Sequence, residues 1–519
     1  MKKRRLSKGA MAAIAALAVA STGFSPTTVE AKPNSAKTNW SNAEEWTKRH
    51  TVDDIYNMLA DLEKHYPKYA ELGSLGTTQN NNEIKVLTIT NEKISDEEKT
   101  GIGWFANIHG DEREAGECGA YAAAWILENL DDPTVQQILE KHILYVVPIL
   151  NPDSHNIWDY FVRGTSQPLD KNGDGIPSND VYADITGDGW IGSLSTRDAE
   201  GNRTADLGYE SKDLDGNGYL GDDSWASGAD INRNFDFMWE EGLEFNGKSA
   251  GEYAAPEVET QMIQNFMAEH PMSALASLHT GIQTVLYPWC YRDVDTSNAE
   301  EVADIDFMAA TAEKMRSAFE QTAQRNFYTM SSYKDYQTYC ELIDYAYGTY
   351  GTHAYTIEVY QPGGSEKTAY NPDHDPADAS VCAWNETDYE GSKKDDIPYD
   401  EFVEMLKANG LTPEKVKVTG EETTLAQLHD QGKAESIYVN ASDRCQRKWH
   451  VPQDQDMMVA GAKDAMLQMI YAEGKVQDPS ISEPEEPEHP GNGNAYGKYK
   501  PDNPNKGPGN NSSNKNKQK

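Results

Sequence analysis

The chain has 519 residues, enough for one large α/β domain with appendages or for two or three average domains. It carries 85 acidic and 46 basic residues, and its formal charge of -39 repels nucleic-acid phosphates and anionic membrane surfaces. We therefore expect no nucleic-acid partner. Five cysteines are too few for a disulfide scaffold in a chain of this size.

The first residues are typical of an export signal. The basic stretch "MKKRRLSK" is followed by the short apolar run "GAMAAIAALAVA" and by "VEA", which ends at Ala31. This run is too short to span a bilayer, and no later run of about 20 apolar residues occurs. We expect residues 1–31 to be a signal peptide and the mature chain to be a secreted, extracellular monomer without a membrane span, either free or associated with a cell wall.

Apolar periodicity predicts an alternation of helices and strands. Residues 51–67 have apolar side chains at helical spacing, with Thr51 as N-cap and Pro67 after the end. A second helix is expected at 115–130. Buried strands are expected at "IKVLTIT" (84–90), "GIGWFANI" (101–108), "ILYVVPIL" (143–150), "SALASLH" (273–279) and "HAYTIEVY" (353–360). The alternation predicts an α/β fold with a mixed, mostly parallel twisted sheet and helices on both faces.

The composition changes near residue 476. Residues 40–475 contain all the predicted elements and are expected to form the folded domain. Residues 476–519 are rich in Pro, Gly, Asn and Lys and nearly free of aliphatic side chains. Such a segment cannot bury enough apolar surface to offset its chain entropy, so we expect a disordered tail.

Ionisable residues follow two of the predicted strands. His109 and Glu112 in "HGDE" can turn an imidazole and a carboxylate toward one point, and His279 ends another strand. Zinc accepts nitrogen and oxygen ligands, and a catalytic zinc site has three protein ligands. Glu358 lies in the run "TIEVY", and a buried carboxylate near a metal can act as a general base. Taken alone, each residue also fits a structural role.

The order of these motifs resembles that of the zinc metallocarboxypeptidases related to pancreatic carboxypeptidases A and B. In that family, an H-x-x-E pair, an N-P-D-G segment, an N-R-N segment, a histidine that ends a strand and a late glutamate follow one another. The corresponding stretches here are "HGDE" (109–112), "NPDS" (151–154), "NRN" (232–234), "SLH" ending at His279, and "TIEVY" around Glu358. The resemblance covers roughly residues 50–362 and indicates a secreted, bacterial-type member with a carboxypeptidase-like fold.

The resemblance implies a role for each matching residue. His109, Glu112 and His279 would hold one zinc ion, and Glu358 would take a proton from the attacking water during hydrolysis of the C-terminal peptide bond. Asn232 and Arg233 would grip the free terminal carboxylate, for which the planar guanidinium of arginine is well suited. Tyr336, in "YQTYCELIDY", would cover the bound end residue. Arg163 is the nearest candidate for the arginine that stabilises the oxyanion, although its flanking residues differ from the family pattern.

The resemblance also places the specificity pocket near Ile343, Glu341 and Cys290. Ile343 stands where the A type has an apolar residue and the B type an aspartate, which favours large apolar or aromatic end residues. Glu341 would instead attract a terminal Lys or Arg if its carboxylate faced the pocket, because a buried charge requires a partner. If Glu341 faced solvent, it would not affect specificity. The sequence favours the apolar preference and leaves the basic one open.

An acidic insertion at 165–228 separates the N-P-D and N-R-N segments. Its stretches "DKNGDG" (170–175), "DITGDG" (184–189) and "DLDGNG" (213–218) resemble the start of an EF-hand loop. None has a glutamate at the twelfth position, so we expect isolated structural calcium loops, completed by Asp180, Asp222 or Asp223; metal-free Asx turns are the alternative. The candidate calcium ligands are Asp170, Asn172, Asp174, Asp184, Asp188, Asp213, Asp215 and Asn217, of which the last three make the best single site.

Three functions are compatible with this pattern. The leading hypothesis is a secreted zinc carboxypeptidase that acts on peptides and proteins with a free C-terminus. The first alternative is a peptidase of the same fold that cleaves cell-wall peptides; Arg233 counts against it, because related wall-peptide enzymes commonly lack that residue. The second is a non-catalytic, calcium-dependent wall-binding protein. The presence of the general-base candidate Glu358 counts against that alternative, since a binding module has no need of one.

Overall fold

The computed structural model describes residues 38–155, 164–165, 180, 182–188, 191–221, 229–246, 251, 253–360, 370–379, 393–441 and 454–479. The expected signal peptide at 1–31 lies outside these residues, as does all of the expected tail except 476–479. No helix in the described ranges is long and apolar enough to cross a membrane.

An eight-stranded sheet forms the centre of the main module, with the strand order β1-β2-β4-β3-β7-β10-β8-β9. The four central strands β4, β3, β7 and β10 are parallel to one another. On one side of these strands, β2 is antiparallel to both β4 and β1. On the other side, β8 is antiparallel to β10 and parallel to β9. The strands are β1 (Ala70–Thr77), β2 (Glu83–Ile89), β3 (Thr100–Ala106), β4 (His142–Val147), β7 (Met272–His279), β8 (Thr284–Tyr287), β9 (Tyr328–Ser331) and β10 (His353–Glu358). The predicted mixed, mostly parallel sheet is confirmed.

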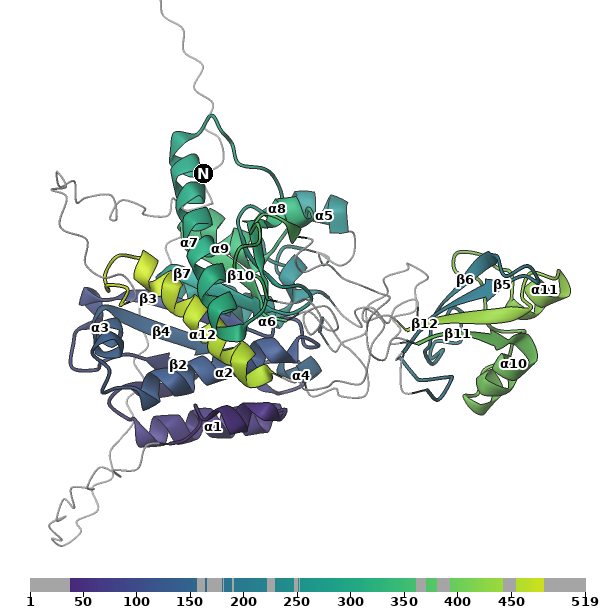
Figure 1. Cartoon of the computed structure of the whole chain (residues 1–519), viewed down its shortest axis with the longest axis horizontal. Helices are drawn as coiled ribbons and strands as arrows, with labels where there is room; N and C mark the ends of the chain where they lie inside the picture. Colours follow the sequence, from purple (N-terminus) through teal and green to yellow (C-terminus); the bar gives the residue numbers. More distant parts are fainter. Residues whose placement is uncertain are drawn as a thin grey trace, which may run out of the picture. The chain divides into compact units, whose positions relative to one another are not determined.

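Helices cover both faces of this sheet (Figure 1). The α-helices of the main module are α1 (Val52–His65), α2 (Arg113–Glu128), α3 (Pro133–Lys141), α4 (Pro152–His155), α5 (Trp239–Asn246), α6 (Val258–Glu269), α7 (Ala299–Ala323), α8 (Ser332–Asp335), α9 (Leu342–Tyr350) and α12 (Gln455–Ala472). The 3-10 helices are η1 (Ala43–Thr47), η2 (Asp96–Glu98) and η3 (Ile231–Arg233).

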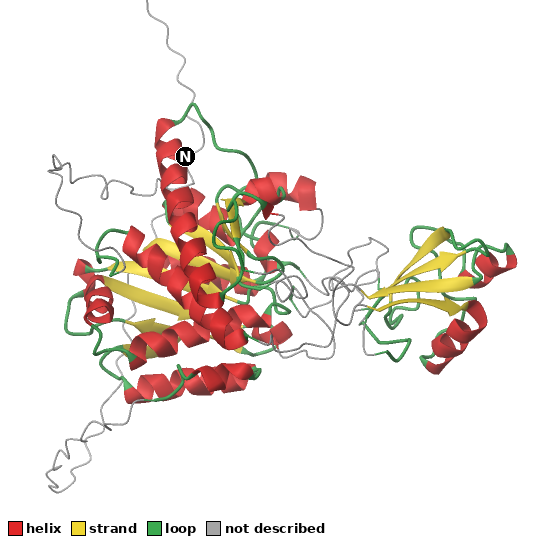
Figure 2. Ribbon diagram, viewed as in Figure 1, coloured by secondary structure: helices red, strands yellow, loops and turns green. Residues whose placement is uncertain are grey.

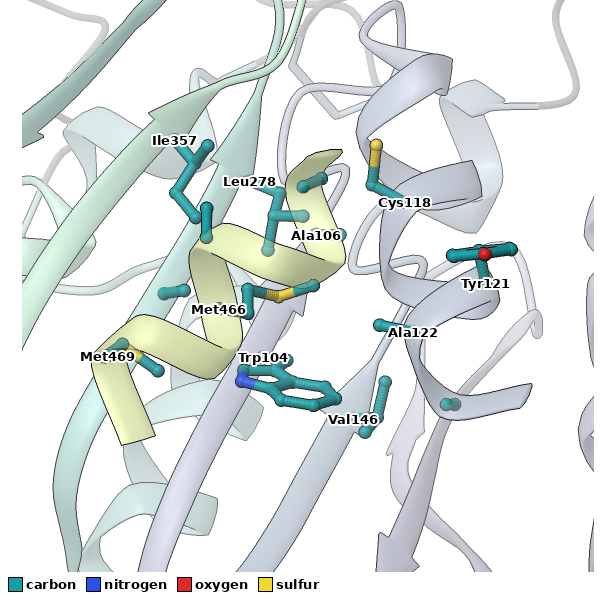
Figure 3. Close-up of a cluster of buried hydrophobic side chains, with 14 of the residues drawn as sticks. Trp104, Ala106, Cys118, Tyr121, Ala122, Val146, Leu278, Ile357, Met466 and Met469 are labelled. Atoms are coloured by element: carbon teal, nitrogen blue, oxygen red, sulfur yellow. The ribbon is translucent and has the colours of Figure 1, made fainter. Parts of the chain in front are cut away.

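Adjacent residues of β3 point to opposite faces, as the alternation of a strand requires. Trp104 belongs to the core beneath α1, α2, α7 and α12, whereas Phe105 belongs to the core beneath α6 and α9. Figure 3 shows Trp104 in the same cluster as Met466 of α12 and Ala122 of α2. Full burial of a side chain such as Met466 contributes about 2 kcal/mol. These two cores hold the strand ends in fixed positions.

The first helix begins where the sequence predicts it. The Thr51 side chain accepts a hydrogen bond from the Asp54 backbone, and the Asp54 carboxylate accepts one from the Thr51 backbone, which completes a capping box. Ile55, Leu59 and Leu62 are fully buried against the sheet layer. The predicted helix at 51–67 is therefore confirmed as α1.

A second, four-stranded sheet has the order β11-β12-β5-β6. Its strands are β5 (Ser193–Arg197), β6 (Arg203–Tyr209), β11 (Lys393–Pro398) and β12 (Ser436–Ala441), and its helices are α10 (Tyr399–Ala408) and α11 (Leu425–Asp430). Figure 2 shows these helices beside the strands. The sheet has its own core, which includes Leu194, Leu207, Phe402 and Leu425. The acidic insertion thus contributes two strands to a module completed by residues 393–441, which the sequence did not predict.

Candidate metal centre and substrate site

The ends of three parallel strands bring the predicted metal ligands together. β3 lies beside β7, with Ala106 opposite Leu278, and β7 lies beside β10, with His279 opposite Glu358. The turn after β3 carries His109 and Glu112. Ligands of α/β proteins commonly bind at the carboxyl ends of parallel strands, and all four ionisable side chains come from that edge.

The turn between β3 and α2 is built around Asn107. This residue has φ of 56°, a left-handed conformation that asparagine tolerates better than most residues. Its buried side-chain NH2 donates to the carbonyl oxygens of His109 at 2.7 Å and Glu112 at 2.9 Å. Its Oδ1 lies 2.8 Å from Nδ1 of His155. The side chain therefore fixes the shape of the loop that presents two ligands.

One donor atom from each of His109, Glu112 and His279 lies within 4.8 Å of the other two, and all three residues are buried. Nδ1 of His109 lies 2.8 Å from Oε1 of Glu112, Nδ1 of His279 lies 2.8 Å from Oε2, and the two Nδ1 atoms are 3.2 Å apart. Two nitrogen donors and a carboxylate that converge in this way match the ligand chemistry of zinc. The structure thus brings the three predicted ligands together as a candidate zinc site.

The far side of each histidine ring is held by a second residue. Nε2 of His109 lies 3.0 Å from Oδ1 of Asp230, and Nε2 of His279 lies 3.0 Å from Oγ of Ser277. A carboxylate on the far nitrogen orients a histidine ligand and leaves Nδ1 directed at the metal. The sequence analysis missed Asp230, Ser277 and Asn107. For Asp230, the available signal was an acidic residue just before the "NRN" segment.

The ionisation of the cluster reflects its burial. Burial would raise the pKa of Glu112, but His109 and His279 hold that pKa well below its ordinary value. Burial lowers the pKa of His279, and the Glu112 carboxylate acts in the opposite direction. The backbone N–H of Thr280 also donates to Oε2 of Glu112 at 3.2 Å. Glu112 is therefore present as a carboxylate at neutral pH.

Glu358 lies at the last position of β10, directly opposite His279 in the parallel register. A Cβ atom at Gly281, two residues after His279, would be 3.6 Å from Oε2 of Glu358, so the carboxylate lies next to the turn that follows β7. The side chain is half-buried. The carboxylate is thus placed beside the metal ligands without belonging to the cluster of three.

The residues predicted to hold the substrate also lie together. Arg233 is buried, and its Nη2 donates to the hydroxyl of Tyr336 at 3.0 Å. Its Nη1 donates to the carbonyl oxygen of Asn232 at 2.9 Å and pairs with Oε1 of Glu341 at 2.9 Å. The Asn232 side-chain oxygen accepts from the backbone N–H of Leu342 at 2.9 Å. Tyr336 is 55% exposed, as expected of a side chain that can move over a bound end residue.

The residues expected at the specificity pocket, Ile343 and Cys290, are buried, and so is the neighbouring Asp344. Ile343 and Cys290 belong to the same buried core, and both oxygens of Asp344 accept from the backbone N–H of Cys290, at 3.0 and 3.1 Å. Burial, assisted by the nearby Glu341, raises the pKa of Asp344 to about 7. Burial also raises the pKa of the Cys290 thiol well above its ordinary value, so it remains a neutral thiol.

Six predicted residues lie outside the described parts of the structure, namely Arg163, Asp170, Asn172, Asp174, Asp222 and Asp223. Carboxylate oxygens of Asp180, Asp213 and Asp215 lie within 4.8 Å of one another. Asp184 and Asp188 join no such group of three among the described residues. Oδ1 of Asp184 accepts from the backbone N–H groups of Gly187 at 2.6 Å and Asp188 at 3.0 Å, so this side chain caps the backbone of its own loop.

Comparisons with known proteins agree with this geometry. A family model described as "Zinc carboxypeptidase" matches residues 55–375. Carboxypeptidase SOL1 of Arabidopsis thaliana is 32% identical over 108 residues, which are 21% of this chain and 22% of that protein. Carboxypeptidase B of Helicoverpa zea is 23% identical over 255 residues, which are 48% of each chain.

The chain spans less than half the length of these two relatives. The solved structure of carboxypeptidase A from Helicoverpa armigera is 17% identical and has a TM-score of 0.41, over 61% of this chain and 66% of that one. The family model matches more than half of the sequence and includes His109, Glu112, His279 and Glu358. This chain therefore belongs to the zinc carboxypeptidase family.

Proposed function

We propose that this chain is a zinc-dependent carboxypeptidase that hydrolyses the C-terminal peptide bond of peptides and proteins. The convergence of His109, Glu112 and His279, with Glu358 beside His279 in the sheet, carries the proposal. A binding module would need neither a carboxylate beside the metal ligands nor a buried arginine next to them. The pairing of Arg233 with Tyr336 supports an exopeptidase, because a guanidinium can bind a free terminal carboxylate.

The three converging side chains would hold zinc, and a zinc ion there supplies Lewis-acid chemistry that makes water more acidic and the scissile carbonyl more electrophilic. Glu358 takes the proton from the attacking water and later returns it to the leaving amine. Arg233 and Asn232 position the terminal carboxylate. Asp230 and Ser277 hold the rings of the two histidines, so that their donor atoms stay directed at one point.

The proposal is tested with blocked dipeptides and the purified full chain. Zinc-loaded protein should release the C-terminal residue, a zinc chelator should abolish this release, and added zinc should restore it. Matched substrates that end in a C-terminal amide should be cleaved far more slowly, because they lack the charge that Arg233 binds. His279→Ala should bind less than stoichiometric zinc. Metal-independent release of the end residue would overturn the proposal.

For the module that contains the acidic insertion, we propose one structural calcium site at Asp180, Asp213 and Asp215. Calcium prefers several carboxylate and carbonyl oxygens, and the "DLDGNG" sequence supplies them in the order of a calcium loop. Asp180 comes from a separate part of the insertion, yet its Oδ1 accepts from the backbone N–H of Leu214 at 2.7 Å. Added calcium should raise the Tm of zinc-saturated protein, and Asp213→Asn should remove that rise. Equal Tm values with and without calcium would refute this site.

We also propose that the chain is exported as a secreted, bacterial-type enzyme. The support is the basic and apolar pattern of residues 1–31 together with the strongly acidic remainder of the chain. N-terminal sequencing of protein recovered from the culture medium should begin at Lys32. An intact N-terminus on protein retained inside the cell would contradict this proposal.

A further inference from the structure

Glu341 is a buried carboxylate that contacts the proposed substrate-binding arginine. It immediately precedes α9, and it is 6% exposed. Its Oε1 pairs with Nη1 of Arg233 at 2.9 Å and accepts from the Thr338 hydroxyl at 2.6 Å. Its Oε2 accepts from the Cys290 thiol at 3.4 Å. The carboxylate therefore points inward. Of the two orientations that the sequence left open, Glu341 does not have the solvent-facing one, in which it would not affect specificity.

Both ends of the Arg233 guanidinium are engaged before any substrate arrives. Nη1 contacts Glu341 and the carbonyl oxygen of Asn232, and Nη2 donates to the Tyr336 hydroxyl. A terminal carboxylate that approaches Arg233 must share Nη1 with Glu341 or displace it. Because the two are both anions, their contact with the same nitrogen is unfavourable unless another cation is present.

A count of charges shows which substrate brings that cation. Arg233 and Glu341 neutralise each other, and the neighbouring Asp344 is a further carboxyl group and adds no positive charge. A peptide that ends in an apolar residue adds one negative charge and leaves Glu341 without compensation. A peptide that ends in Lys or Arg adds the same carboxylate together with a cation. Only the second substrate keeps the buried group electrically balanced, and an uncompensated buried charge is strongly unfavourable.

The position of Glu341 also suits a side chain that extends from the metal centre. Its partner Arg233 lies in η3, and the N-cap residue of η3, Asp230, contacts Nε2 of His109, so this short helix links the Glu341–Arg233 pair to the metal centre. Oε2 contacts Cys290, which belongs to the same buried core as Ile343. A terminal residue bound between the metal centre and Arg233 would thus direct its side chain toward a region that contains a carboxylate as well as apolar groups.

Building on the proposed carboxypeptidase function, we propose that Glu341 makes the site selective for C-terminal residues with a cationic side chain, such as Lys and Arg. In the free protein, Glu341 occupies Arg233. When a basic end residue binds, its carboxylate takes Arg233 and its side chain takes Glu341. For an apolar end residue, Glu341 is a competitor of the substrate carboxylate. The proposed selectivity for cationic side chains is thus the opposite of the apolar preference that Ile343 alone favours.

The test compares two peptides that differ only in the end residue, Arg or Leu, with zinc-saturated protein. The wild-type chain should cleave the Arg peptide with a kcat/KM at least about tenfold higher. Glu341→Gln should lower kcat/KM for the Arg peptide and raise it for the Leu peptide, because the released Arg233 no longer has a competing anion. A merely structural role for Glu341 would lower both values together.

Glu240→Gln on α5 is the matched control, since it removes one exposed carboxylate from the same module and should leave the Arg-to-Leu ratio unchanged. If Glu341→Gln does not fold, free arginine and free leucine are compared as product inhibitors of the wild-type chain, and arginine should bind at least about tenfold more tightly. Equal inhibition, or a wild-type preference for Leu, would overturn the inference. Cleavage of neither peptide would refute the proposed function itself.

Discussion

Glu112 lies between two imidazole rings whose donor nitrogens are only 3.2 Å apart. Each ring is oriented from behind, His109 by Asp230 and His279 by Ser277. The three side chains thus form a preorganised donor set, in which metal binding requires little rearrangement. Preorganisation of this kind reduces the entropy lost on binding, which explains why so many polar contacts converge on a few atoms.

Substitution of Glu358 tests its proposed role as the general base. Glu358→Gln keeps the size of the side chain but cannot accept a proton, so kcat should fall by about 10²–10⁴-fold. Zinc content should remain stoichiometric, because Glu358 is outside the cluster of three ligands. Metal analysis and single-turnover kinetics on the same sample check both expectations. Turnover within a few-fold of the wild-type rate would show that another group accepts the proton.

The sequence identified the ligands but not the residues that support them. His109, Glu112, His279 and Glu358 lie in motifs whose order is recognisable without a structure. Asn107 and Ser277 act through contacts that exist only after folding, and neither residue type in a strand or turn is distinctive. The orientation of Glu341 was equally inaccessible, because one residue before a helix can face the core or the solvent with the same sequence.

At the scale of elements, the turn from β3 to α2 depends on Asn107. Asn107→Gly removes the hydrogen bonds to the carbonyl oxygens of His109 and Glu112, while glycine accepts the positive φ without strain. We expect zinc affinity to weaken by about 10–100-fold, the usual effect of losing a residue that supports metal ligands. Competition with a chromophoric chelator measures this. Asn107→Ala adds backbone strain and should be worse, and unchanged affinity in the glycine variant would assign the side chain no role in positioning.

Among the elements, the buried parallel strands were predictable and the second sheet was not. The runs that became β3, β4, β7 and β10 are mostly apolar and are buried along almost their whole length, because both of their faces are covered by helices. β11 has the sequence "KKDDIP" and β5 has "SLSTR", and neither shows a clear apolar alternation. Their pairing through β12 joins segments that are far apart in the chain, a contact that local patterns cannot indicate.

At the scale of the whole molecule, the burial of carboxyl groups and the net negative charge both lower the stability of the folded state as the pH rises. Burial raises the pKa of several carboxyl groups, to about 8 for Glu114 and to about 7 for Glu210, Glu259 and Asp344. The formal charge of -39 is reached only when all of these carboxyl groups are ionised. Ionisation of these groups therefore adds buried charge to a molecule that repels itself, and both effects destabilise the folded state as the pH rises.

Glu210 allows this pH dependence to be measured on a carboxyl group that is not one of the candidate zinc ligands. It is fully buried in the second module, where its carboxylate accepts from the backbone N–H groups of Thr186 at 2.9 Å and Gly192 at 2.6 Å. Burial raises its pKa from 4.5 to about 7 despite these hydrogen bonds. Because the pKa is higher in the folded chain, folding favours the protonated acid. The stability it contributes is fully present below about pH 4.5 and is lost as the pH rises through about 7.

Glu210→Gln should therefore flatten the stability profile, since glutamine has no charge at any pH. The difference in free energy of unfolding, variant minus wild type, should be larger at pH 8 than at pH 5, by up to about 3 kcal/mol. Urea unfolding of both proteins at the two pH values, with saturating zinc and equal ionic strength, measures the difference. Using the same zinc concentration cancels the increase in zinc affinity at high pH, which acts on both proteins alike. If the free energies of unfolding of the two proteins differ by the same amount at both pH values, Glu210 stays ionised in the folded chain. The N–H groups of Thr186 and Gly192 would then outweigh the effect of burial on its pKa.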